Sequence, residues 1–266
     1  MNYFYAFIII VLFYIAFKFL FIQAYVDFTE RYLFKNKKDF FKFILNPVLS
    51  VKSKDRYLNL YYYLGLLLST VWGLLIASRI QEYIDISRIN LSIGILYILS
   101  LLFFILFLLY LSIFDIISFS IPEVVSKRML LFALVVNILF LILKIVLSTN
   151  EISYVFYLIN LGSILNLIGG ILGGGLIWII VKVSKERAMG AGDIDILAAI
   201  GLMLGFPSIF YSFFYTLVSA SIISILYVGI KRKYKGVLIP FVPFLSTGFI
   251  LCLVLKDLFL RLFNIF

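Results

Sequence analysis

The amino-acid sequence predicts an all-α fold, a polytopic membrane bundle of about eight transmembrane helices. Of its 266 residues, 64% are hydrophobic, and its mean hydropathy is +1.17, whereas soluble domains are closer to half apolar. Several apolar runs are longer than about 18 residues, which is enough to cross a hydrocarbon core. In lipid, only helices and closed barrels satisfy all backbone hydrogen-bonding groups. The apolar residues in these runs are continuous, whereas the strands of a barrel would alternate apolar and polar residues. We therefore expect helices.

The expected spans are apolar runs separated by polar segments. In order, they cover residues 3–24, 58–78, 90–114, 129–148, 156–181, 194–206, 208–230 and 237–255. The first is too long for a signal-peptide core and has no small-residue cleavage site, so we expect a retained anchor. We divide the chain into this anchor with a basic loop, residues 1–57, and a membrane-embedded domain, residues 58–266.

Lysine and arginine assign the two faces of the expected bundle. Most of the 23 basic residues lie on one side, within residues 25–57, 115–128, 182–193 and 231–236. The positive-inside rule places that side in the cytosol, so both termini face outward. The chain carries a net charge of +10. We expect its lysine and arginine side chains to contact anionic lipid headgroups rather than nucleic acid.

The side-chain inventory excludes several kinds of chemistry. With no histidine, the chain lacks Ser-His and Cys-His catalysis and the usual histidine metal motifs. Cys252 is its one cysteine, so neither an intrachain disulfide nor a cysteine zinc cluster can form. We expect no metal and no cofactor, and we look for chemistry among the carboxylates.

Asp115 and Asp193 are the candidate catalytic residues. Asp115 closes the third expected span, and Asp193 opens the sixth within Gly190-Ala191-Gly192-Asp193. Two spans separate the aspartates, so both end at the cytosolic face, and carboxylates in such places usually have a function. Two neighbouring carboxylates do not ionise together easily. One can then activate water while the other donates a proton to a peptide carbonyl.

Each candidate also has a structural explanation. Aspartate favours helix N-caps, so either carboxylate taken alone can be a cap at the water-exposed end of a span.

The glycines before Asp193 have an expected role of their own. We expect Gly190 and Gly192 to adopt positive φ angles and to let a substrate strand approach closely.

Further residues on the same face are candidates for substrate binding. Pro122 and Glu123 follow Asp115, and Asp195 lies two positions beyond Asp193. We expect these acids to attract a basic substrate segment. At the last span, two prolines form an irregular, rigid entry, which membrane proteins tolerate only where protein or a cavity covers it; the candidate residues there are Pro240, Phe241 and Pro243.

The fifth expected span is rich in glycine. Small residues four apart occur at 169 and 173 and again at 170 and 174. Such spacing favours close helix contacts in lipid. We expect it to press this span, and with it the loop that carries Asp193, against a neighbouring helix.

Together these segments resemble the type IV prepilin leader peptidases, membrane aspartic proteases that process type IV pilins and type II secretion pseudopilins. Residues 189–201 look like the second catalytic segment of that family. Asp115 followed by Pro122 looks like the first, and residues 239–245 look like its proline-phenylalanine segment. The resemblance covers about residues 95–250.

The resemblance implies that Asp115 and Asp193 are the catalytic pair. It implies a substrate with a short basic leader and a hydrophobic helix behind it, cut after a glycine at the cytosolic face of the inner membrane. The family usually has lysine where Asp195 stands, and aspartate or asparagine where Glu123 stands. Residues 25–57 lack the family's four zinc-binding cysteines, so we expect peptidase activity and leave N-methylation open.

Three other interpretations compete with this one. A transporter with a carboxylate proton relay would usually place its acids near the membrane midplane. A presenilin-like protease would carry a proline-alanine-leucine element, which is absent. A non-catalytic scaffold would use Asp115 and Asp193 only as caps, and Asp→Asn substitutions separate it from the enzyme.

Overall fold

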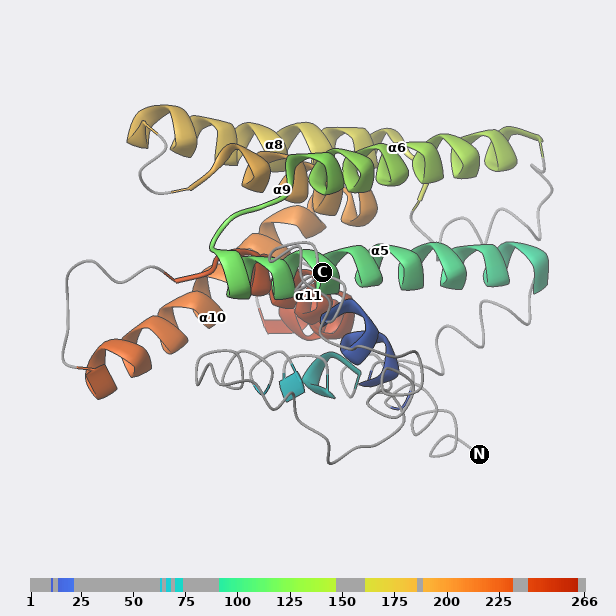
Figure 1. Cartoon of the computed structure of the whole chain (residues 1–266). Coiled ribbons are helices and arrows are strands. Elements are labelled where there is room, and N and C mark those ends of the chain that lie inside the picture. Colours follow the sequence, from blue (N-terminus) through green and yellow to red (C-terminus); the bar gives the residue numbers. More distant parts are fainter. Residues whose placement is uncertain are drawn as a thin grey trace.

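The structure is a computed structural model that describes residues 11, 14–21, 63, 66–67, 70–73, 91–146, 161–185, 189–231 and 239–262 (Figure 1). The expected basic loop at 25–57 lies outside these residues, as do most of the first two expected spans. Where those two spans are described, as at 14–21 and 70–73, the chain is helical.

Six helices have described bounds, namely α5 (Leu91–Ser118), α6 (Glu123–Val146), α8 (Ile164–Ser184), α9 (Ala191–Leu204), α10 (Ser208–Lys231) and α11 (Val242–Leu262). The described part of the chain contains no strand. Four helices, α5, α6, α8 and α10, are long and apolar enough to cross a membrane. The prediction of a helical membrane bundle is confirmed.

Two helix boundaries next to the aspartates differ from the expected spans. α5 continues to Ser118, so Asp115 lies inside its last turn rather than after it. α9 begins at Ala191, so Asp193 lies in the first turn and does not begin the helix. Hydropathy marks where a helix meets lipid, whereas the backbone hydrogen bonds that define its ends continue through polar residues.

α6 also begins earlier than expected, at Glu123. The carbonyl of Pro122 accepts hydrogen bonds from the N–H groups of Val125 at 2.9 Å and Ser126 at 3.1 Å. An acidic residue is favourable in a first turn because the helix dipole is positive there. Pro122 therefore ends the loop after α5 and Glu123 begins the next helix.

α8 and α9 form a helical hairpin that carries Asp193 (Figure 1), and glycines make the interface between the two helices. A Cβ atom added at Gly201 would lie 2.1 Å from the carbonyl oxygen of Gly169, and one at Gly173 would lie 2.6 Å from that of Leu197. These separations are far inside van der Waals contact, so the two backbones touch. The expected close contact of the glycine-rich span is confirmed, and its neighbour is α9 itself.

α9 is too short to cross a membrane alone. Its 14 residues extend about 21 Å at 1.5 Å per residue, against a hydrocarbon thickness of about 30 Å. Its last carbonyls therefore end inside the bundle, where an unpaired backbone group is costly. The buried amides of Asn137 on α6 and Asn166 on α8 each donate to the Leu202 carbonyl at 2.9 Å. These two side chains cap α9 and fix its position along α6 and α8.

α11 packs against both α5 and α10. A Cβ at Gly248 would lie 2.4 Å from the Ser212 carbonyl of α10, so glycine allows this close approach too. On the other side, the buried hydroxyl groups of Ser112 on α5 and Ser246 on α11 lie 2.9 Å apart.

The ends of α5 and α8 and the beginnings of α6, α9 and α11 gather at one end of the bundle, on the left in Figure 1. We call it the aspartate end, because Asp115 lies in the last turn of α5 and Asp193 in the first turn of α9. The long helices thus bring together segments that lie far apart in the sequence.

The α8–α9 contact predicts opposite results for two glycine substitutions. In Gly201→Ala, the added methyl group meets the Gly169 backbone, so the melting temperature in detergent should fall by about 3–10 °C, for an overpacking penalty of about 1–3 kcal/mol. In Gly175→Ala, the added group meets nothing within 4 Å and should leave the melting temperature unchanged or slightly higher. Equal melting temperatures for the two variants would contradict this account.

Candidate active site

Asp115 is buried at the aspartate end, with 6% of its surface exposed. Its Oδ2 atom accepts a hydrogen bond of 3.0 Å from the backbone N–H of Val242, the first residue of α11. The backbone of Phe241 also approaches the carboxylate. The N-terminus of α11 therefore faces Asp115, and the positive end of its dipole favours negative charge there.

Asp193 has a closely similar setting on α9. It is 5% exposed, and its Oδ2 atom accepts a hydrogen bond of 2.9 Å from the N–H of Gly190. Its own N–H donates to the Gly190 carbonyl at 3.2 Å, so the side chain reaches back over the helix start from the third helical position. The Oδ1 atom is buried and has no hydrogen-bond partner among the described residues.

The two carboxylates are close enough to repel each other electrostatically. Asp193 lies before the apolar part of α9. Burial there raises the pKa of its carboxyl from 3.8 to about 6, and the Gly190 hydrogen bond opposes part of that rise. The aspartate end thus brings together two shielded carboxylates, of which Asp193 holds a proton more readily than an exposed aspartate.

The expectation of positive φ angles at Gly190 and Gly192 was wrong. Gly190 is the N-cap of α9 with φ −88°, Gly192 lies within the helix, and the described glycines with positive φ are Gly162 and Gly205. Glycine is instead needed at position 192 because the backbone there packs closely against Ile121. A Cβ added there would lie 2.8 Å from both Cβ and Cγ2 of Ile121.

The loop between α5 and α6 therefore packs directly on the first turn of α9. Phe119, which begins this loop, has a φ of +52°, and its N–H donates to the Asp115 carbonyl at 2.8 Å. The loop continues to Ile121, which contacts Gly192. A short segment thus links the helix turn of one aspartate to that of the other.

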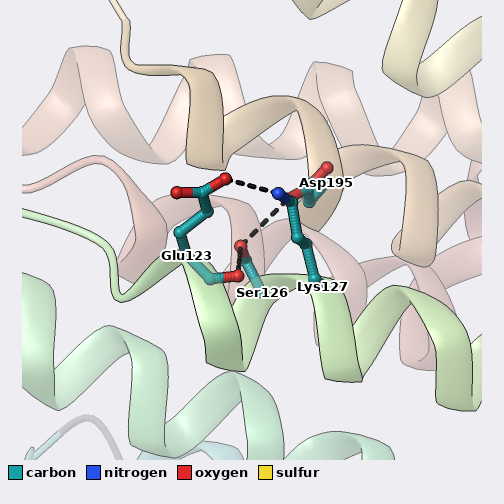
Figure 2. Close-up of polar contacts among 4 residues, drawn as sticks. All are labelled: Glu123, Ser126, Lys127 and Asp195. Carbon is teal, nitrogen blue, oxygen red and sulfur yellow. Dashed lines mark hydrogen bonds and ion pairs between the residues drawn. The ribbon is translucent and has the colours of Figure 1, made fainter.

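Glu123 on α6 and Asp195 on α9 both already have partners (Figure 2). Glu123 is exposed and forms an ion pair with Lys127. Asp195 accepts a hydrogen bond of 3.0 Å from the hydroxyl of Ser126, so it joins the starts of α6 and α9. Lys127 also interacts electrostatically with Asp195, which offsets part of the expected acidic character.

The proline-containing segment meets the site through its backbone. Pro240 and Phe241 precede α11, and Pro243 lies in its first turn. Sequence reasoning did not select Val242, the residue whose N–H reaches Asp115. The available signal was its position between two prolines, since proline has no N–H to offer. The contact of Ser126 with Asp195 was not predicted either, and only the packing of α6 on α9 reveals it.

Among the described residues, no group of three or more histidine, cysteine, aspartate or glutamate side chains could hold a metal ion.

The loop contact predicts that the two glycines near Asp193 differ in tolerance. Gly192→Ala should reduce activity strongly, because its methyl group pushes Ile121 and the loop after α5 away from α9. Gly190→Ala meets only Asp193 Oδ2, at 3.9 Å, and its φ suits any residue. It should therefore lose less activity unless a substrate needs that space. Activity assays of both variants, with melting temperatures, check this; greater loss in Gly190→Ala would point to substrate contact there.

Comparison with known proteins gives this site a family. A family model described as the type IV leader peptidase family matches residues 102–228, which run from α5 to α10 and include both Asp115 and Asp193. No curated protein and no solved structure matches the chain. The predicted resemblance is confirmed, and the family implies peptidase activity. Over residues 102–228, just under half of the chain, this membrane protein is similar to the type IV leader peptidase family.

Proposed function

We propose that the protein is a membrane-embedded aspartic endopeptidase that removes the short basic leader of type IV prepilins or type II secretion pseudopilins. The observation that carries the proposal is the pair of buried, mutually repelling carboxylates, Asp115 and Asp193, at one end of the bundle. Each is held by a backbone N–H at the start of a helix. The family match supports a peptidase at this site.

The unpaired oxygen of Asp193 supports this assignment further. A buried polar atom without a partner typically destabilises the folded state by about 1–3 kcal/mol. Such atoms are uncommon, and each calls for an explanation such as a catalytic role or a bound water. Asp193 Oδ1 is where we place the attacking water or the substrate carbonyl.

The proposed reaction needs one proton on the pair. The ionised carboxylate takes a proton from water, the water oxygen bonds to the scissile carbonyl carbon, and the protonated carboxyl donates to the carbonyl oxygen. The intermediate then returns a hydroxyl proton to the second group while the first protonates the leaving nitrogen, and the C–N bond breaks. The pair again holds one proton, which belongs to both groups together.

The membrane setting suits a substrate with a soluble leader and an apolar helix. The aspartate end lies at the ends of helices long enough to span a membrane, so the helix behind the leader can stay in lipid while the leader reaches the site. We place this end at the cytosolic face of the inner membrane, because the positive-inside rule favours that face. Anionic headgroups there would contact the basic loops.

Residues around the pair are proposed to hold the substrate. The residues that we assign to this role are Gly190, Gly192, Pro122, Pro240, Phe241 and Pro243, together with the acids Glu123 and Asp195. A leader lysine or arginine would compete with Lys127 for these two acids. Of the other functions, a presenilin-like cut inside the membrane gives a different product, and the position of the aspartates at helix ends disfavours a midplane proton relay.

Replacing either aspartate should abolish cleavage. We expect Asp115→Asn and Asp193→Asn each to lower the cleavage rate of a basic-leader prepilin roughly a thousandfold or more. The loss is large because removing one member of a catalytic unit costs about as much rate as removing the whole unit. The assay uses purified protein in detergent and reads each new N-terminus by mass spectrometry. Asp257→Asn makes the same chemical change near the far end of α11 and should cleave like the parent.

The melting temperature of each variant distinguishes catalysis from folding. A dyad predicts variants that remain folded and are inactive, whereas a cap predicts variants that keep most of their activity. If the folded parent itself leaves the prepilin uncut, the proposed function is wrong. A product cut within its hydrophobic helix would favour the presenilin-like alternative.

Cleavage should also depend on pH. Burial raises the pKa of Asp193 to about 6, so above this pH the pair loses the proton that the reaction needs. We expect kcat/KM to fall roughly tenfold per pH unit above about pH 6, measured at constant ionic strength with melting temperatures at each pH. A rate that rises between pH 6 and 8 would show that a different group supplies the proton.

A further inference from the structure

The hydrogen bond between Val242 and Asp115 joins two helices that lie 127 positions apart in the sequence. It is buried and 3.0 Å long. Val242 is the first residue of α11, where a helix has N–H groups without partners in its own backbone. A helix terminus therefore contacts a carboxylate that we place in the reaction.

Two prolines restrict which N–H groups this terminus can offer. Pro240 and Pro243 have no N–H, and the N–H of Phe244 donates to the Phe241 carbonyl at 3.0 Å. Only Phe241 and Val242 remain as free backbone donors in this stretch, and both approach Asp115. The spacing of the two prolines therefore leaves free backbone N–H groups only next to Asp115.

A ring of hydrogen bonds holds Val242 in place. The hydroxyl of Ser246 donates to the Val242 carbonyl at 2.8 Å and lies 2.9 Å from the hydroxyl of Ser112. Ser112 precedes Asp115 on α5 by about one turn. The contacts thus run from Asp115 to Val242, to Ser246, to Ser112 and back along α5, so they fix the relative position of the two helices at the site.

The chemistry of the donor suits a carboxylate that must change its protonation state. A backbone N–H stabilises negative charge but carries no charge and cannot transfer its proton, unlike lysine. Among the described residues, the one charged group that interacts with the Asp115 carboxylate is Asp193 on α9. The described side chains of α5 and α11 contribute no other charge.

We propose that Val242 is a positioning residue of this active site, whose N–H holds Asp115 Oδ2. Ser246 and Ser112 support it by fixing Val242. This inference rests on the proposed peptidase function for its kinetic consequences, but the hydrogen bond itself can be measured without activity.

Val242→Pro tests the donor directly. Proline is favoured at the first helical position, so this substitution removes the N–H and keeps the helix. Val242→Ala removes more of the side chain and keeps the N–H. We expect kcat for Val242→Pro to be roughly tenfold or more below that of Val242→Ala, as for loss of a charge-assisted hydrogen bond. KM should be similar, and the acid limb of the pH–rate profile should move to higher pH.

A second pair of variants serves if Val242→Pro does not fold. Ser246→Ala breaks the ring, and we expect a smaller fall in kcat with a pH shift in the same direction. Thr247→Ala is the matched control, because Thr247 donates to the Pro243 carbonyl in the same way and has Trp72, rather than Ser112, as its second hydrogen-bond partner. Equal kinetics for Ser246→Ala and Thr247→Ala, or for the two Val242 variants, would overturn the proposal.

An amide resonance separates this inference from the proposed function. In ¹⁵N-labelled protein, the Val242 amide signal should move with pH in the parent and stay fixed in Asp115→Asn. A titrating signal in a parent that does not cleave prepilin would uphold the contact and reject the peptidase assignment. If the parent cleaves prepilin but its Val242 signal does not change with pH, the peptidase assignment stands and the proposed role of Val242 is wrong.

Discussion

The close contact between α8 and α9 is the constraint on which the site depends. α9 carries Asp193, yet it is too short to span the membrane, so its position comes from its neighbours. Gly169 and Gly201 bring the two backbones together, and Asn137 and Asn166 hold the Leu202 carbonyl. Loss of these contacts would let α9 shift relative to α5 and would disturb the pair.

The two aspartates are then held by the same physical device, although they lie on different helices. Gly190 N–H binds Asp193, and Val242 N–H binds Asp115, each at a helix start. Uncharged donors of this kind stabilise a carboxylate without an ion pair that would fix its charge. The mutual repulsion of the carboxylates and their burial favour retention of a proton, which the proposed hydrolysis requires.

Several features could be predicted from the sequence because they depend on composition or on local spacing. Long apolar runs predicted the helices, the glycines at 169 and 173 predicted a tight helix contact, and the motifs around Asp115 and Asp193 predicted the family. Helix ends were less predictable. α6 begins at Glu123 because Pro122 accepts its first hydrogen bonds, and hydropathy carries no information about that.

The sequence by itself determined that this is a helical membrane protein, with two carboxylates on one face and a family resemblance that comparison confirmed. Only the tertiary structure decided what surrounds them. The purpose of Gly192 is its contact with Ile121 rather than a positive φ, Asp195 joins Ser126, and Val242 reaches Asp115. These contacts link residues on separate helices, and no local pattern specifies which helix faces which. That choice depends on how the whole bundle packs its small residues and pairs its buried polar groups.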